Sequence, residues 1–168
     1  MEALNNGERV AVARLHALLD LLPTALDRQL AGTGLTSFEF ILLEALYEAD
    51  DRRLRLSALA SRTNATLPRL SRVVTGLERK GLVIRVACES DGRATNGVLT
   101  ASGERAYAMT RPLHDQAVRE MILDGLGEEG VTRLAELSLA ILTRLDPDRR
   151  LAVTVDNSSP ACPADPGA

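Results

Sequence analysis

Residues 56 to 99 constrain the fold more than any other part of the chain, because they combine two helix patterns with two strand patterns. A short helix is expected over residues 58–63, and the turn "NAT" follows it. Thr66 then caps a second helix, since Pro68 falls in its first turn and Gly81 is its expected end. The buried stripe of this helix is predicted to be Leu67, Leu70, Val73, Val74 and Leu77. Two helices joined by a tight turn form a helix-turn-helix arrangement.

Two β-rich runs follow the second helix. "LVIRVAC" at 82–88 and "ATNGVLT" at 94–100 predict strands, and the connecting "ESDGR" holds Asp-Gly at its centre. "LRL" at 54–56 can supply one further short strand. A hairpin after the second helix turns the helix-turn-helix into a winged helix. That helix shows Ser, Thr and Arg near its start, where DNA-reading helices place base-contacting side chains.

The rest of the chain is predicted to be helical. Its apolar residues recur at three- and four-residue steps. The expected helices cover about residues 5–31, 37–49, 101–126 and 128–145. Pro23 should kink or break the first of these helices, and Pro112 should bend the third. Thr36 and Glu39 have the spacing of a capping box at the start of the second. The fold class is therefore mainly α with a small β-wing.

Charge is distributed unevenly along the chain. The 168 residues carry a formal net charge of −3. From Arg52 to Thr95, however, ten basic residues face three acidic ones, which gives +7, and the remainder is −10. A basic centre in an acidic frame is what a polyanion-binding surface needs. A solvated arginine-rich face explains the same charge, so the charge alone does not decide between them.

Several classes of protein and site find no support in the sequence. There is no apolar run of about 18 residues, and the acidic N-terminus does not resemble a signal peptide, so a cytoplasmic protein without a membrane span is expected. Cys88 and Cys162 form no metal-ligand pair, and His16 and His114 are the only histidines. P-loop, HExxH, GxSxG and CxxC motifs are absent from the sequence. We therefore expect no catalytic residues, no metal and no cofactor.

The order and spacing of four segments resemble the MarR family of transcription regulators. The segments are "GLTSFEFILLEAL", "RLSALASRTNATLPRLSRVVTGLERKGLV", "SDGRATNGVLTASGERA" and the "H…VR…DGL" run at 114–126. "LERKGLV" is the most specific piece, together with Asp91-Gly92-Arg93 followed by "LT..G" at 99–103. The resemblance spans roughly residues 15–145. It implies an obligate homodimer in which each winged helix reads half of a palindromic operator in double-stranded DNA.

This implied dimer divides the chain into regions. Residues 1–35 and 101–146 would form a helical dimerisation region, because their apolar stripes exceed what one winged helix can cover. A monomeric helical cap is the alternative. Residues 36–100 would form the winged helix-turn-helix DNA-binding domain. Residues 147–168 are rich in proline and polar side chains, which predicts a disordered tail.

The resemblance also implies particular contacts with DNA. Carried over residue by residue, the recognition-helix contacts fall on Thr66, Pro68, Arg69, Ser71 and Arg72. Arg93 matches the wing arginine that enters the minor groove, and Asp91 matches the acid that holds it. Arg72 could instead bind phosphate only. This chain departs from the family pattern at Gly92, where a second Arg or Lys is common, and Cys88 replaces a frequent Asp.

These expectations favour a dimeric DNA-binding repressor. The resemblance leaves open relief of repression by a small aromatic or lipophilic effector, with His16 and His114 near the family's effector pocket. The alternative for both histidines is a pair of partly exposed side chains in the helical region. A winged-helix protein-interaction module without DNA binding is the alternative function. The basic segment and the exposed Ser and Arg of the second helix favour DNA, and no constellation speaks for an enzyme.

Overall fold

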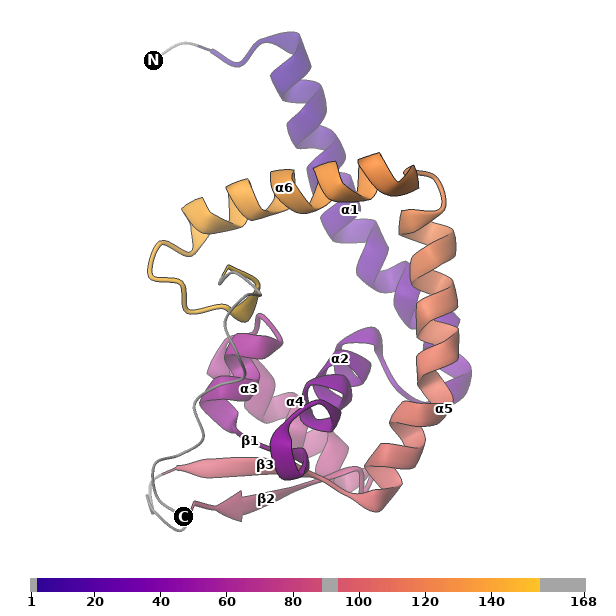
Figure 1. Ribbon diagram of the computed structural model, residues 1–168, viewed down its shortest axis with the longest axis vertical. Coiled ribbons are helices and arrows are strands. Elements are labelled where there is room, and N and C mark those ends of the chain that lie inside the picture. The colour runs from indigo at the N-terminus through magenta and orange to yellow at the C-terminus, as the bar shows by residue number, and fades with distance from the viewer. Residues whose placement is uncertain (1–2, 89–93, 155–168) are drawn as a thin grey trace.

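A computed structural model describes residues 3–88 and 94–154 (Figure 1). In chain order the elements are α1 Asn6–Leu30, η1 Ala31–Thr33, α2 Ser37–Tyr47, η2 Asp50–Arg52, β1 Arg53–Arg55, α3 Leu56–Arg62, α4 Leu67–Arg79, β2 Val83–Ala87, β3 Thr95–Leu99, α5 Ala101–Val118, the π-helical η3 Arg119–Leu123, α6 Gly127–Leu145 and η4 Ala152–Thr154. The predicted architecture, mainly helical with a small β-wing, is confirmed.

Helix starts follow the local signals in the sequence. Asn5 and Glu8 form a capping box at the start of α1, and Thr36 and Glu39 form the predicted one at the start of α2. The first helix does not break at Pro23, since α1 is continuous through it. The expected helix over 101–126 is shorter than predicted, because α5 ends at Val118 and a π-helical turn follows.

The wing is a three-stranded antiparallel sheet with the order β1-β3-β2. In its register, Leu54 of β1 pairs with Gly97 of β3, and Ile84 of β2 pairs with Val98 of β3. The short run predicted at 54–56 thus supplies a third strand, one residue earlier than expected. The central strand β3 leads directly into α5, which carries the chain away from the winged helix (Figure 1).

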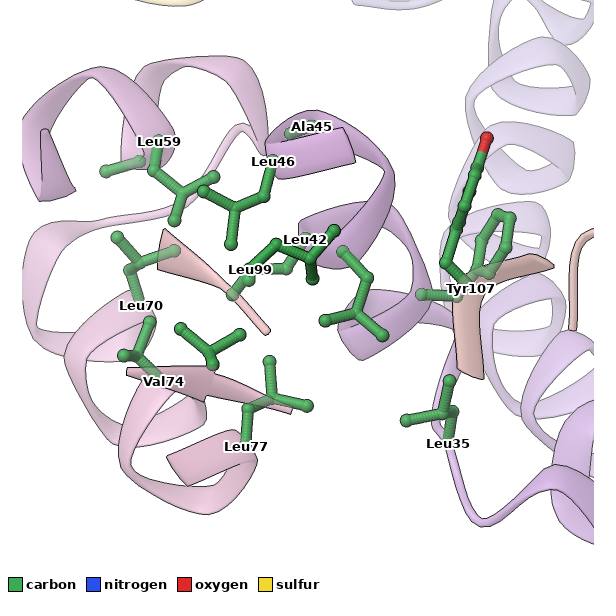
Figure 2. Packing of buried hydrophobic residues seen from close by; sticks show 14 of the residues in the cluster. Leu35, Leu42, Ala45, Leu46, Leu59, Leu70, Val74, Leu77, Leu99 and Tyr107 are labelled. Carbon is green, nitrogen blue, oxygen red and sulfur yellow. The ribbon is translucent and has the colours of Figure 1, made fainter. Parts of the chain in front are cut away.

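The core lies between α2, α3, α4 and the sheet. Leu70, Val74 and Leu77 of α4 are fully buried, and Figure 2 shows them pointing at the other leucines of the cluster. The predicted stripe of α4 is correct for these three residues. It is wrong for Leu67, whose side chain is 50% exposed at the start of the helix. Burial of the leucine stripe fixes the opposite face of α4 outward.

Two long helices expose their apolar side chains. Leu30 is the one buried residue of α1 and α6 has none. Leu19 of α1 is 64% exposed and Leu137 of α6 is 60% exposed. The large apolar side chains exposed on these helices are Val10, Val12, Leu15, Leu18, Leu19, Leu21, Val131, Leu134, Leu137, Leu139, Ile141 and Leu145. Such a surface on a single chain marks an interaction site.

The chain does not lose its structure at Pro147, where the predicted tail begins. Asp146 accepts hydrogen bonds from the backbone N–H groups of Arg150 and Leu151 and from Thr154 Oγ1, at 3.0, 2.8 and 2.7 Å. Ser61 of α3 donates to the Arg150 carbonyl, so this turn touches the winged helix. The sequence does not indicate this turn, because Asp146 holds residues that carry no apolar pattern. Residues 155–168 of the predicted tail lie outside the described residues.

Within residues 3–88 and 94–154, no helix combines the length and the apolar character needed to cross a membrane.

Candidate DNA-binding interface

The second helix of the helix-turn-helix, α4, presents its first turn to solvent. Thr66 has extended backbone angles and lies at the N-cap, and Pro68 lies within the first turn. The Thr66 side chain makes no capping hydrogen bond, so the sequence analysis was wrong to assign it that role. Thr66, Leu67 and Pro68 are exposed together, which leaves one hydroxyl and two apolar groups at the tip of the helix. Leu67 was missed as a candidate contact because periodicity alone placed it in the buried stripe.

The two arginines of the first turns have different surroundings. The guanidinium of Arg69 lies over the ring of Phe38 in α2, 4.3 Å from the centroid. Arg72 is exposed, and its Nε lies 3.4 Å from the carbonyl of Pro68 within the same helix. Arg72 therefore extends from the outer face of α4, whereas Arg69 rests against the neighbouring helix.

Ser71 lies on the side of α4 that faces the wing. Arg85 of β2 donates from Nη2 to the Ser71 carbonyl at 2.8 Å and to Ser71 Oγ at 3.3 Å. The other nitrogen of Arg85, Nη1, pairs with Glu78 near the end of α4. These contacts fasten the wing to the recognition helix, which the sequence analysis did not predict.

Several cations of the basic segment have partners inside the protein. Lys80 Nζ lies 2.7 Å from Glu39 Oε1 and 2.8 Å from the Gly34 carbonyl. Arg52 Nε pairs with Glu104 at 3.0 Å, and Arg62 donates to the Ala45 carbonyl at 3.3 Å. These three cations of the basic segment therefore stabilise the fold through contacts within the protein. The exposed cations described on this segment are Arg53, Arg69, Arg72, Arg79 and Lys80.

The tip of the wing, with Asp91 and Arg93, lies outside the described residues. Its approach is described as far as Cys88, which is buried with 8% exposure and whose Sγ lies 3.7 Å from Arg55 Nη2. The predicted roles of Asp91 and Arg93 stay predictions.

The two histidines occupy different environments. His16 is exposed on α1. The ring of His114 on α5 stacks on Phe40 of α2, and its side chain is 15% exposed. Within the described residues, no hydrogen bond or ring contact joins the two histidines. The structure therefore does not bring them together as one site.

An aromatic and acidic group surrounds His114. Tyr107 stacks on Phe40 with centroids 5.5 Å apart, and its hydroxyl lies 3.5 Å from Glu44 Oε1. Burial raises the pKa of the Glu44 carboxyl, and the neighbouring Glu48 raises it further. Burial also raises the pKa of the Tyr107 hydroxyl. This group joins the winged helix to α5.

Among the residues that the structure describes, no group of three or more His, Cys, Asp or Glu side chains is placed to hold a metal ion.

A helix-turn-helix with a three-stranded wing, an outward recognition helix and long flanking helices defines a winged helix-turn-helix protein. A family model described as "MarR family" matches residues 33–94. AbsC, a MarR family transcriptional regulator from Streptomyces coelicolor, is 32% identical with a TM-score of 0.82, over 88% of this chain and 99% of AbsC. The chain therefore belongs to the MarR family.

Two further relatives are informative. Sco3205, a MarR family transcriptional regulator from Streptomyces coelicolor whose structure is in complex with DNA, is 34% identical with a TM-score of 0.84, over 89% of this chain and 97% of Sco3205. The HTH-type transcriptional repressor YetL of Bacillus subtilis is 30% identical over 104 residues. That alignment spans 62% of this chain and 62% of YetL.

Proposed function

We propose that this protein is a sequence-specific transcriptional regulator that binds double-stranded DNA and acts as a repressor. The observation that carries the proposal is the orientation of α4. Its leucine stripe is buried, so Thr66, Pro68 and Arg72 are presented on the outer face of a helix-turn-helix. Membership of the MarR family and the DNA complex of the related Sco3205 support the same function.

The side chains have separate roles in this proposal. Arg72 would read a base edge in the major groove, while Thr66 and Pro68 would contact the DNA at the start of the helix. Arg69 would contact a DNA phosphate from its place over the Phe38 ring, or would move away from that ring to reach a base. Arg93, oriented by Asp91, would enter the minor groove beside the half-site, as the resemblance to the family implies.

The protein would bind a palindromic operator as a homodimer. The exposed leucines of α1 and α6 support this, because their apolar faces need a partner and a second copy offers a matching surface. Removing residues 1–20 would delete much of the exposed stripe of α1. We expect aggregation or a weakened dimer in sedimentation, and a stable monomer that still binds the operator would contradict the dimer.

A small aromatic or lipophilic effector remains part of the proposal. The aromatic group of Phe40, Tyr107 and His114 supports it, since these side chains lie between the DNA-reading domain and α5. His16, exposed on α1, is the other side chain that we propose for effector contact. We place the regulator in the cytoplasm with its DNA, and we propose no enzymatic activity.

The function is tested by capturing genomic fragments on the purified protein and sequencing them. We expect one palindromic motif, and binding to it is then measured by fluorescence anisotropy. Arg72→Ala should cost about 1–3 kcal/mol on this operator and much less on scrambled DNA, because a base contact is lost. Arg133→Ala, which removes an exposed cation from α6, is the matched control and should change neither.

Equal losses for Arg72→Ala on both DNAs would show that Arg72 binds phosphate only. Capture of no enriched motif by the wild-type protein would reject the function and favour a protein-interaction module.

A further inference from the structure

The C-terminal end of α4 lies where the winged helix connects to the two long helices α1 and α5. The chain enters the winged helix from α1 through Gly34, and it leaves β3 through Thr100 into α5. Lys80, the C-cap residue of α4, donates from Nζ to the Gly34 carbonyl at 2.8 Å. The carbonyl of the next residue, Gly81, accepts from Thr100 Oγ1 at 2.8 Å. One end of the recognition helix is therefore bonded to both connections.

Lys80 also binds the start of α2. Its Nζ lies 2.7 and 2.8 Å from the two carboxylate oxygens of Glu39. Glu39 is buried, and its Oε2 accepts the backbone N–H of Thr36 at 2.9 Å as part of the capping box. A buried carboxylate needs such partners, because removing its charge from water is costly. The Lys80–Glu39 pair therefore fixes the end of α4 against the segment that follows α1.

The same segment is bonded to α1 through Asp27. Asp27 Oδ1 accepts the backbone N–H of Ser37 at 2.7 Å and the Ser37 hydroxyl at 2.6 Å. Gly34, between α1 and α2, has a φ of 73°, in the left-handed region that glycine adopts most readily. Further along, α1 packs against α5 beside the winged helix (Figure 1). Contacts of Asp27 and Lys80 thus link the recognition helix to α1 across the connection at Gly34.

This link matters for a dimer that binds two half-sites. The two recognition helices must then meet DNA at a defined separation and angle. One additional base pair between the half-sites moves one of them by about 3.4 Å along the DNA axis and turns it by about 35°. A winged helix that pivots at Gly34 can follow this displacement, whereas one fixed to α1 cannot. The stiffness of the link therefore limits which spacings the dimer accepts.

We propose that Lys80 and Glu39 are positioning residues that hold the recognition helix at a set angle to α1, and so restrict the protein to operators with one spacing between half-sites. The inference rests on the proposed binding of a palindromic operator by a homodimer, and it assigns the control of spacing to this pair. Neither residue needs to touch DNA for this role. Glu39 is a buried anion, and Lys80 Nζ already lies within hydrogen-bond distance of three oxygen atoms of the protein.

The test uses the full-length protein, the captured operator, and two altered operators with one base pair inserted or removed at the centre of the palindrome. The wild type should bind both altered operators more weakly. The ratio of Kd on an altered operator to Kd on the captured one is the spacing penalty. Lys80→Met/Glu39→Gln removes both charges together and leaves no unpaired carboxylate buried. It should remain a dimer in sedimentation and reduce the spacing penalty by at least about threefold, because the link is loosened.

Two other roles of Lys80 predict different results. A phosphate contact predicts that the double variant loses affinity equally on all three operators, with a salt-dependence slope lower by about 1 per site. A role in stability alone predicts a lower melting temperature with an unchanged spacing penalty. Either result would overturn the inference. Arg79→Met, which removes the neighbouring exposed cation of α4, is the matched control and should leave the spacing penalty unchanged.

The single variants test whether the two residues act as a pair. Lys80→Met and Glu39→Gln should each reduce the spacing penalty, and the double variant should fall short of the sum of their effects. Additive effects reject the inference, and so does a double variant that sediments as a monomer. If the double variant does not fold, Lys80→Gln keeps a donor but is shorter and uncharged. It should reduce the spacing penalty in the same direction, and an unchanged penalty rejects the inference.

The wild-type protein separates failure of this inference from failure of the proposed function. A captured palindromic motif that the wild type binds equally well at all three spacings rejects the inference alone. Capture of no enriched motif rejects the proposed function as well.

Discussion

His114 on α5 stacks on Phe40 on α2, with ring centroids 4.1 Å apart and an angle of 26° between the planes. Among the residues that the structure describes, the buried His114 Nδ1 atom has no hydrogen-bond partner, and the nearest Asp115 oxygen lies 3.6 Å away. The stack therefore combines a favourable ring contact with an unsatisfied polar atom. The contact also joins the winged helix to α5, the helix that leads toward the apolar surface of α6.

Replacing His114 should separate these two effects. His114→Ala should destabilise the protein by about 1–3 kcal/mol, because it removes a buried ring from its stacking partner. His114→Phe should be neutral or stabilising, because it keeps the ring and removes the unpaired nitrogen. Urea denaturation of both variants measures the difference, with exposed His16→Ala as the control at less than about 0.5 kcal/mol. Equal destabilisation by Ala and Phe would show that the nitrogen, rather than the ring, matters.

Glu44 should make stability depend on pH. Burial, and then Glu48, raise the pKa of Glu44 above its ordinary value of 4.5, so the folded protein binds this proton more tightly than the unfolded chain does. The contribution of Glu44 is therefore most favourable at low pH and is lost as pH rises through the folded pKa. Glu44→Gln should raise the melting temperature at pH 7, and the gain should vanish as pH falls toward 4.5.

Thermal unfolding of Glu44→Gln between pH 4.5 and 8 tests this sign. Glu136→Gln, on the exposed surface of α6, is the control and should show no such trend. A Glu44→Gln variant that is less stable at pH 7 would mean that the carboxylate contributes more as a partner of Tyr107 than its burial costs.

Gly103, the glycine of "LT..G" at 99–103, lies at a tight junction between the wing and α5. Thr100 Oγ1 caps α5 by accepting the Gly103 N–H at 3.0 Å. A Cβ added at Gly103 would overlap the carbonyl oxygen of Leu82 and lie 2.6 Å from Leu99 Cδ1. Gly103→Ala should therefore destabilise by about 1–3 kcal/mol or more, because backbone cannot move away cheaply. Chemical denaturation measures it, and Gly32→Ala, with nothing within 4 Å of the added Cβ, should be neutral. A neutral Gly103→Ala would show that β3 and α5 can separate at their junction.

Most of the fold could be predicted from the sequence, because it depends on local patterns. The capping box of Thr36 and Glu39 and the buried Leu70, Val74 and Leu77 depend on residues three or four positions apart, so their spacing is visible in the sequence. The exposed surface at the start of α4 was harder to predict from the sequence. Leu67 follows the same period but lies in the first turn of the helix, where it is 50% exposed, so period alone wrongly assigned it to the core.

Partners that lie far apart in the sequence could not be read from it. Lys80 and Glu39 are 41 residues apart, yet Lys80 holds a carboxylate whose side chain is only 11% exposed. Arg52 and Glu104 are 52 residues apart. Counting charges between Arg52 and Thr95 therefore overestimated the cations available to DNA. Only the three-dimensional pairing separates the structural cations from Arg72.

The turn that follows α6 should contribute to the stability of the protein. Asp146 is buried, and its carboxylate holds the turn at 150–154 through two backbone N–H groups and the hydroxyl of Thr154, which is 4% exposed. A chain ending at Leu145 should therefore melt at a lower temperature than one ending at Thr154. Deleting residues 155–168 should change little, because that stretch is rich in proline and polar residues and offers no apolar stripe.

The same turn should respond to acid with a defined sign. The hydrogen bonds from Thr154 and Leu151 hold the pKa of Asp146 below its ordinary value of 3.8, so its contribution is present above that pH and is lost as pH falls through the folded pKa. Asp146→Asn should lower the melting temperature at pH 7, and its difference from the wild type should shrink below pH 3.8. Asp148→Asn is the control, because Asp148 pairs with Arg150 on the exposed surface, where such pairs contribute little. An Asp146→Asn variant as stable as the wild type at pH 7 would show that the turn does not hold the end of α6 against α3.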